Sequence, residues 1–495
     1  YRLVNEGKPY FLSRPRRFGK SLLLSTLKAY FEGKKELFTA VSGQPALAAV
    51  ELEKEWRSYP VFHIDFNAGD YREPPGLNTA IDNSLARLEK TWGENPKETS
   101  FPARFQGLIE RAAEKTGRKV VVLIDEYDKP LLEAGDTAGR DYARDTLSSF
   151  YGVLKSADPW LKFYLITGIT KFPKVSIFSE LNQLLDISLM EEYAPLCGIT
   201  GVELSRYFSP DIQALAEKNG MSFEAALEET RKRYNGYHFA EDTEGVYNPF
   251  SLLNTLKRKK FQYYWFETGT PTFLVKTLAK INFDLPSLKD SVTISANSIM
   301  DYRFDSSGIV PLLYQSGYLT IKGYDPGLNE YTLGFPNEEV EYGFLKELLS
   351  AYSPWAGGGR QGLYIGSFMK DLDAHNIDSL MNRFRALFSG IPYPLTPQNE
   401  YHYQTLLYLV FTLMGEFAQA EVASAAGRSD MTVMRRDTIY VFEFKLAGGG
   451  TAEEALDQID RKGYLLPYSA EGKTLVKVGV EFDRQTRTIG RWLSA

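Results

Sequence analysis

"FLSRPRRFGKSLLLSTL" (residues 11–27) decides the fold of the N-terminal part of this chain. A phosphate-binding loop has the pattern G-x-x-x-x-G-K-[ST], and Gly19, Lys20 and Ser21 supply its second half. Arg14 stands where the pattern has its first glycine. An apolar stretch precedes the loop and an amphipathic helix pattern follows it, which is the context that such a loop needs. The stretch predicts a P-loop, with a surface turn before a helix as the alternative.

A nucleotide bound at this loop would meet several of its side chains. The free N–H groups at the start of the following helix favour a phosphate. Lys20 would reach the β- and γ-phosphates of ATP, and the Ser21 hydroxyl would bind Mg²⁺. Arg16 and Arg17 would either add positive charge beside the phosphates or pair with acidic neighbours.

A second motif, "KVVVLIDEYDKPL" (119–131), also indicates a nucleotide site. It is a buried strand that ends in Asp125 and Glu126, at the end of the strand where open α/β sheets bind ligands. Asp125 suits Mg²⁺ binding, directly or through water, and Glu126 suits polarising the attacking water. Thr167 follows a later strand and is a candidate sensor of the γ-phosphate, with a core or capping role as the alternative.

Short apolar runs alternate with helical patterns over the N-terminal third of the chain, which predicts a parallel sheet with helices on both faces. The predicted strands cover residues 9–13, 61–66, 120–125, 163–168 and 184–189. Amphipathic helices and aromatic-rich turns follow, and then the Gly/Pro-rich stretch "SPWAGGGRQG" (353–362), which is typical of a linker. We therefore expect three domains, at residues 1–195, 196–352 and 363–495.

Several motifs resemble the bacterial AAA-ATPase-like family: "RPRRFGKS", "LIDEYDKPL", "FPKVSIFSELNQLLDISL" and "YNGYHF" with "VYNPFSLLN". The similarity covers nearly the whole chain. It implies an N-terminal P-loop NTPase domain in which the first glycine of the loop is often replaced. It also implies a C-terminal PD-(D/E)XK nuclease domain. The amphipathic helices and aromatic-rich turns between the two domains predict a helical lid or winged-helix-like region.

"GRSDMTVMRRDTIYVFEFKL" (427–446) contains Asp430, Glu443 and Lys445. Residues i and i+2 of a strand point to the same face, so Glu443 and Lys445 project together. Asp430 and Glu443 could hold one or two Mg²⁺ ions for phosphodiester hydrolysis, and Lys445 could orient the nucleophile or stabilise developing charge. The spacing alone also arises by chance in a partly exposed strand with an ion pair.

The order of elements around this stretch, α-β-β-β-α, resembles the PD-(D/E)XK nuclease superfamily. In that pattern Glu400 corresponds to the acidic residue of the first helix and Gln458 to the glutamine of the helix after the E-x-K strand. Tyr464 lies further from Gln458 than the tyrosine of recombination-type nucleases. Glu421 is a second acidic candidate, although a structural or solvent-facing role suits it better.

The composition limits the partners. Over 495 residues the net charge is −6, so any contact with nucleic acid must be local. "KRKKFQYYWF" (257–266) mixes basic and aromatic residues, but a helix end followed by a buried aromatic strand explains it better. Arg435 and Arg436 are better placed for phosphate contact.

The compartment is also constrained by composition. One cysteine, Cys197, excludes an intramolecular disulfide and fits the reducing cytoplasm, and the four scattered histidines argue against zinc. No apolar run is long enough to span a bilayer, so we expect no membrane partner. Because the chain begins at Tyr1 rather than Met, we expect that an N-terminal piece is missing.

Together these features favour an α/β protein that binds and hydrolyses ATP and uses its nucleotide state to control a C-terminal Mg²⁺-dependent nuclease. Its partner would be a nucleic acid, with DNA favoured, and assembly into a homo-oligomer stays open. The alternative is a nucleotide-dependent switch or assembly module whose nuclease-like domain binds nucleic acid or protein without cleaving it. A third hypothesis joins a P-loop ATPase to an unrelated C-terminal scaffold.

Overall fold

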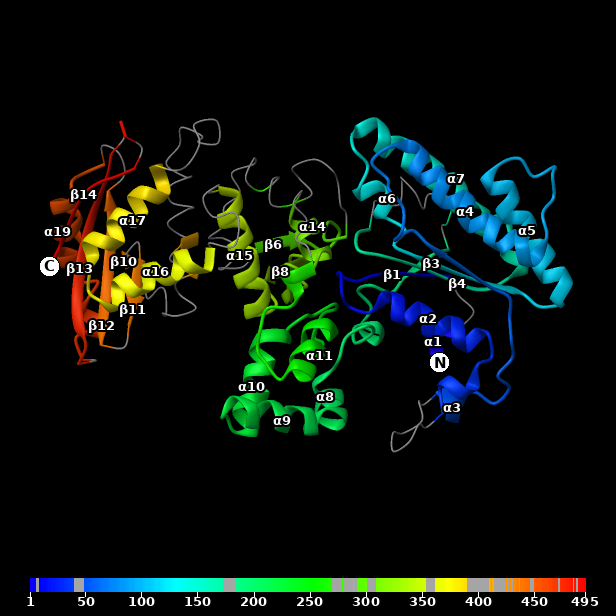
Figure 1. Cartoon of the computed structure of the whole chain (residues 1–495), viewed down its shortest axis with the longest axis horizontal. Helices are drawn as coiled ribbons and strands as arrows, with labels where there is room; N and C mark the ends of the chain where they lie inside the picture. The colour runs from blue at the N-terminus through cyan, green and yellow to red at the C-terminus, as the bar shows by residue number, and fades with distance from the viewer. Residues whose placement is uncertain are drawn as a thin grey trace. The chain divides into compact units, whose positions relative to one another are not determined.

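Five parallel strands form the sheet that carries the P-loop (Figure 1). In spatial order they are β2 (Val61–Asp65), β3 (Val120–Asp125), β4 (Leu161–Gly168), β1 (Pro9–Ser13) and β5 (Leu185–Asp186). All five predicted strands are present, although β5 is shorter than the predicted range 184–189. Since β4 lies between β1 and β3, its carboxyl end lies between the P-loop and the strand that ends in Asp125.

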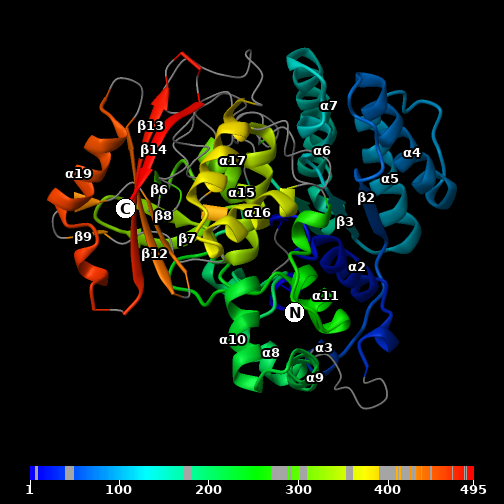
Figure 2. The same ribbon diagram turned by 60° about the vertical axis from the view of Figure 1, so that its left-hand side comes forward.

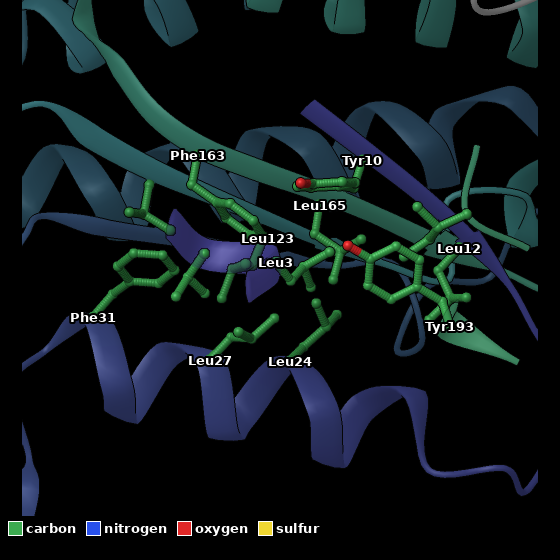
Figure 3. Close-up of a cluster of buried hydrophobic side chains, with 13 residues drawn as sticks. Leu3, Tyr10, Leu12, Leu24, Leu27, Phe31, Leu123, Phe163, Leu165 and Tyr193 are labelled. Carbon is green, nitrogen blue, oxygen red and sulfur yellow. The ribbon is translucent and has the colours of Figure 1, made fainter. Parts of the chain in front are cut away.

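Helices cover both faces of this sheet, as the alternating pattern predicts (Figure 1). The helix after the P-loop packs Leu24, Leu27 and Phe31 against Tyr10 and Leu123 of the strands (Figure 3). Three longer helices cover the other face, and two of them begin after a Ser or Asp cap that accepts a backbone N–H. The helices are α2 (Lys20–Phe31) on one side and α4 (Pro74–Trp92), α5 (Phe101–Thr116) and α7 (Thr137–Ser156) on the other.

The region after this sheet is helical, as predicted, and is followed by a small antiparallel sheet. Its helices are α8 (Gly201–Tyr207), α9 (Ser209–Asn219), α10 (Phe223–Tyr234), α11 (Pro249–Arg258) and α14 (Ile309–Gln315). The sheet has the order β6 (Val292–Ser295), β8 (Glu330–Gly334) and β7 (Thr320–Asp325). Gln315 accepts a hydrogen bond from the backbone N–H of Lys171, at 2.7 Å, which ties this region to the end of β4.

The C-terminal part contains a four-stranded mixed sheet with helices on both faces (Figure 2). Its strands, in spatial order, are β11 (Met431–Met434), β12 (Thr438–Lys445), β13 (Thr474–Asp483) and β14 (Thr488–Ser494). Helix α19 (Ala452–Lys462) connects the parallel pair β12 and β13 and packs on them. On the other face Phe388 of α17 (Ile377–Ser389) packs against Phe482. Two more helices precede α17, namely α15 (Glu338–Tyr352) and α16 (Gln361–Asp373).

The chain divides into two units, and it passes between them three times. The first unit comprises Tyr1–Trp265 and Ser291–Glu338, and the second comprises Phe266–Asp290 and Glu339–Ala495. The three-domain division at 1–195, 196–352 and 363–495 is finer than this and stays a prediction.

This computed structural model describes most of the chain, and among the described residues no helix is both long and apolar enough to cross a membrane. The described residues are 1–5, 9–39, 49–171, 181, 183–268, 274, 278, 288, 292–300, 309–352, 361–389, 409–410, 412–413, 423–424, 427–428, 431–435, 437–445, 449–470, 472–483, 485–486 and 488–495.

Candidate functional site

The P-loop joins β1 to α2 through two residues with left-handed backbone conformations. Arg17 has φ 68° and Gly19, the N-cap of α2, has φ 84°. A Cβ at Gly19 would meet nothing within 4 Å, so its backbone conformation rather than lack of space favours glycine there. Phe18 anchors the loop because its buried ring packs edge-on against Tyr237 and Phe239, at 4.7 and 5.3 Å between centroids. The backbone around Gly19 therefore faces open space while the loop itself is fixed.

Lys20 is buried inside this loop. Its ammonium donates to the carbonyl oxygens of Arg14, at 3.0 Å, and Pro15, at 3.2 Å. An ammonium has three N–H donors, and these two carbonyls are its hydrogen-bond partners among the residues that the structure describes. One donor is thus left for an anion. Ser21 follows in the first turn of α2 and is exposed.

Arg14, which replaces the first glycine, is a buried structural residue with a side chain only 1% exposed. Its guanidinium lies over the ring of Phe239, 4.1 Å from the centroid, and burial lowers its pKa. It donates at 2.8–3.2 Å to four backbone carbonyls, those of Ser13, Ser188, Tyr193 and Leu196. Arg14 therefore fastens the P-loop to the segment that follows β5.

Asp125 and Thr167 meet at the carboxyl edge of the sheet. Asp125 is buried, and its Oδ1 accepts from the Thr167 hydroxyl at 2.7 Å and from the backbone N–H of Glu126 at 3.0 Å. The pair forms because β4 is the neighbour of β3. The structure thus brings together two residues that are 42 positions apart in the sequence.

Glu126 lies just beyond the end of β3 with φ 54°, a left-handed conformation that non-glycine residues rarely adopt. Burial raises the pKa of its carboxyl, while the positive charges of Lys20 and Arg16 act in the opposite direction. A carboxylate with a raised pKa, next to the lysine of the loop, suits a general base.

Asp128 is a buried carboxylate that the motif analysis did not single out. Its Oδ2 accepts from the backbone N–H groups of Ile169, at 3.0 Å, and Thr170, at 2.6 Å, and from the Thr170 hydroxyl at 2.7 Å. Burial raises its pKa. A Cβ at Gly168 would lie 2.6 Å from Asp128 Oδ1, which explains the glycine. Asp128 thus ties the loop after β3 to the end of β4, and its place in "DEYD" was the available sequence signal.

The two other arginines of the loop have different surroundings. Arg17 lies over the ring of Phe250, 4.8 Å from the centroid. Arg16 is exposed, and its backbone carbonyl accepts a hydrogen bond from Trp265 Nε1 at 3.3 Å. A role of either guanidinium in phosphate binding stays a prediction.

A second cluster lies in the C-terminal unit, where β12 and α19 bring Glu443, Lys445 and Gln458 together. Glu443 is 3% exposed, and Lys445 Nζ lies 3.7 Å from its Oε1. The Lys445 ammonium donates to Gln458 Oε1 at 2.5 Å, and the Gln458 amide N–H donates to Glu443 Oε1. One amide therefore bridges the carboxylate and the ammonium and fixes the position of both.

Gly479 lets α19 come close enough for this bridge. It lies opposite Glu443 in the parallel register of β12 and β13. A Cβ there would lie 2.3 Å from the carbonyl oxygen of Ala452 and 3.0 Å from Leu456 Cγ, both on α19. The start of the helix is fixed by a capping box between Thr451 and Glu454.

The rest of the predicted nuclease site lies outside the described residues: Asp430, Glu400, Glu421 and Arg436. Within the described part of the chain no group of three or more His, Cys, Asp or Glu side chains could hold a metal ion. A metal at Glu443 would therefore need further ligands from the remaining residues.

Three other features that the sequence singles out have contacts within the protein. Arg435 forms an ion pair with Asp373, its Nε lying 2.8 Å from Oδ1. Tyr464 is buried in a cluster with Val441 and Ile459. In the basic-aromatic stretch 257–266, α11 ends at Arg258 and Tyr264 is buried, as the structural alternative predicts. The predicted aromatic strand is wrong, because residues 261–264 have no regular secondary structure and a 3-10 turn, Trp265–Thr268, follows them.

Comparison with known proteins gives two family matches. The sequence model of a predicted AAA-ATPase matches residues 1–178, and that of the PD-(D/E)XK nuclease superfamily matches residues 398–492. The second match excludes the hypothesis of an unrelated C-terminal scaffold. Among curated proteins, an uncharacterized protein in the vnfD 5' region of Azotobacter chroococcum mcd 1 is 36% identical over 501 residues, covering 98% of this chain and 92% of the relative.

A solved structure, the Aeropyrum pernix ORC2 protein in ADPNP-ADP complexes, is 12% identical and covers 70% of this chain and 92% of its own, with a TM-score of 0.19.

Replacing Arg14 by Ala should destabilise the first unit by at least about 3 kcal/mol, because an unsatisfied buried acceptor costs about 1–3 kcal/mol and four carbonyls lose their donor. Urea-induced unfolding followed by tryptophan fluorescence measures this change. Arg16→Ala, an exposed neighbour, is the matched control and should change stability by less than about 0.5 kcal/mol. Equal unfolding midpoints for the two variants would contradict the structural role of Arg14.

Gly479→Ala should destabilise the second unit by about 1–3 kcal/mol, because its Cβ would overlap the backbone of α19. Gly366, in the interior of α16, has nothing within 4 Å of its Cβ position. Gly366→Ala should therefore be neutral or stabilise by up to about 1 kcal/mol. Thermal unfolding of both variants gives the comparison, and a shift of the same sign in both would refute the packing argument.

Proposed function

Because the chain belongs to the family of predicted AAA-ATPases that carry a C-terminal PD-(D/E)XK nuclease superfamily domain, we propose that its nucleotide state controls a nuclease. In this proposal the first unit binds and hydrolyses ATP, and the second unit cleaves a nucleic acid, with DNA favoured. The observation that carries the proposal is the convergence of Lys20, Asp125, Glu126 and Thr167 at one edge of the parallel sheet.

The residues at the P-loop fit a nucleotide with its Mg²⁺. Open space around Gly19 and the remaining donor of Lys20 suit the phosphates, and Ser21 and Asp125 would hold the ion. Bound Mg²⁺ would neutralise charge on the phosphates. Glu126 would take a proton from the attacking water, and Thr167, through Asp125, would respond to the γ-phosphate.

The residues of the second cluster fit one end of a metal-dependent phosphodiesterase site. Glu443, together with Asp430, would hold Mg²⁺, which lowers the pKa of water and polarises the phosphate. Lys445 would orient the nucleophile or stabilise the charge that develops on the phosphate. Gln458 holds both side chains in place and is a positioning residue. Glu400 would add a further carboxylate.

The P-loop is held at several points by the middle region, which supports control by nucleotide. A Cβ at Gly317 would lie 2.6 Å from Pro15 Cβ, so the proline ring packs closely on the backbone of Gly317. Trp265, the last residue of the first unit before the chain passes to the second, donates to the Arg16 carbonyl. A phosphate that draws Lys20 away from the Arg14 and Pro15 carbonyls would disturb these same backbone positions.

The second candidate function is a switch whose nuclease-like domain binds without cleaving. Its support is that Arg14 stands in place of the first glycine of the P-loop pattern and that the chain carries a net charge of −6. Ca²⁺-supported binding to nucleic acid without Mg²⁺-supported cleavage would favour it.

Cleavage of labelled single- and double-stranded DNA with Mg²⁺ or Mn²⁺, with and without ATP, tests the leading proposal. Lys445→Ala should abolish cleavage and leave ATP hydrolysis intact. Lys20→Ala should lose ATP binding and the effect of ATP on cleavage, because the ammonium would donate to the phosphates in this proposal. Unchanged ATP binding and cleavage in Lys20→Ala would refute control by nucleotide.

Two further variants, one of them with a matched control, extend this experiment. Gln458→Ala should lower cleavage about 10–100-fold, as is typical for residues that orient metal-site side chains. Asp457→Asn, one position earlier and exposed, is the control and should cleave normally. Trp265→Phe keeps an aromatic ring but removes the hydrogen bond to Arg16, so it should weaken the ATP effect while ATP binding persists.

Glu126→Gln should abolish ATP hydrolysis and preserve ATP binding, because the amide cannot accept the proton of water. In the wild type, hydrolysis requires the Glu126 carboxylate. Since burial raises its pKa, activity should be full at higher pH and should fall as the pH drops through a value above the ordinary range of glutamate. The rate of phosphate release as a function of pH measures this. A profile that stays flat down to the ordinary pKa of glutamate would be inconsistent with this base.

A further inference from the structure

A basic pocket of about 380 Å³ lies in the first unit, away from the P-loop. It is lined by Arg57, Tyr59, Gly117, Arg118, Lys119 and Lys162. Four of these six residues are cationic and none is acidic. The chain as a whole carries a net charge of −6, so this pocket differs in sign from the average surface.

The topology of the sheet explains why these cations meet. Strands β2, β3 and β4 are neighbours and run parallel, so their amino ends share one edge. Arg57 and Tyr59 precede β2, Arg118 and Lys119 precede β3, and Lys162 is the second residue of β4. Lys20 and Asp125 belong to the carboxyl ends of strands, at the opposite edge. The basic pocket is therefore separate from the candidate ATP site.

The charges of the pocket are only partly compensated. Arg57 pairs with Glu55, and Arg118 donates to the backbone carbonyl of Ser58. In the part of the chain that the structure describes, Lys119 and Lys162 have neither an ion-pair nor a hydrogen-bond partner. Two lysines held near two arginines repel one another, and a bound polyanion would relieve that repulsion.

The basic surface continues beyond this pocket. An adjoining pocket of about 320 Å³ shares Arg57, Tyr59 and Lys162 and extends to Lys54 and Trp56. Its carboxylates Glu53 and Glu55 are engaged by the Tyr30 hydroxyl and Arg57. Together the two pockets carry five cationic side chains, with Trp56 and Tyr59 among them. Several cations that lie together with aromatic rings are typical of a surface that binds a nucleic-acid backbone.

We propose that this surface, centred on Lys119 and Lys162, binds the phosphate backbone of a nucleic acid. The choice of nucleic acid among polyanions rests on the proposed function. The site lies on the ATPase unit, so nucleic acid would contact the protein at a place other than the Glu443 cluster.

Binding of fluorescent single- and double-stranded oligonucleotides, measured by anisotropy at several salt concentrations, tests this inference. The full chain carries Lys445→Ala and is kept in EDTA without ATP, so that neither cleavage nor nucleotide enters the measurement. Lys119→Gln with Lys162→Gln should weaken binding about tenfold or more and lower the slope of log affinity against log salt by about 1 per lysine. ATP binding should be unchanged.

The matched control is Lys90→Gln with Lys97→Gln, which removes the same charge from exposed positions of the same unit. It should bind like the parent protein. Equal weakening in both double variants, or unchanged binding and slope in the pocket variant, would overturn the proposal. Binding of the parent protein to anionic vesicles but to no oligonucleotide would also overturn it and would point to a membrane surface. Thermal unfolding verifies that each variant is folded.

This measurement is independent of the catalytic proposal. If the wild type failed to cleave DNA while the pocket variant lost oligonucleotide binding, the nuclease assignment would fail and the binding site would stand.

Discussion

A buried guanidinium that donates to backbone carbonyls holds the P-loop of this protein in place. The Arg14 guanidinium donates to backbone carbonyls of β1 and of the segment after β5. The backbone carbonyl of Arg14 in turn accepts a hydrogen bond from the Lys20 ammonium. Two buried cations thus share one short loop. The buried carboxylates Asp125 and Asp128 and the partly buried Glu126, at the end of β3, balance them within the same unit. The position, charge and hydrogen bonding of Lys20 all depend on this arrangement.

Much of this site could be predicted from the sequence because its parts follow strands with strong apolar patterns. The P-loop and the "LIDE" strand each end at a chemically distinctive residue, and a parallel sheet brings such ends to one edge. The contact between Asp125 and Thr167 could not be predicted, since it depends on β4 lying between β1 and β3. Strand order is a property of tertiary packing and leaves no local signal.

The buried polar residues were the least predictable part. Arg14 was recognised as a departure from the P-loop pattern, but its four carbonyl partners lie up to 182 positions away. Asp128 stands two residues after Glu126, and nothing in that spacing distinguishes a carboxylate that binds backbone N–H groups from one that faces a ligand. In the second unit, Gln458 was identified only through a family resemblance. Its amide can serve as donor and acceptor at once, which is why it can lie between a carboxylate and an ammonium.

The chain passes between its two units three times, so neither unit can be separated from the other by one cut in the sequence. Residues 291–338 return to the first unit after 266–290 have joined the second, and they include Gln315, which binds the end of β4, and Gly317, which packs on Pro15. A gene fragment that stops at Trp265 would encode a P-loop deprived of these supports. Because neither unit is one continuous segment, recombination at a single breakpoint could not exchange one whole unit for another.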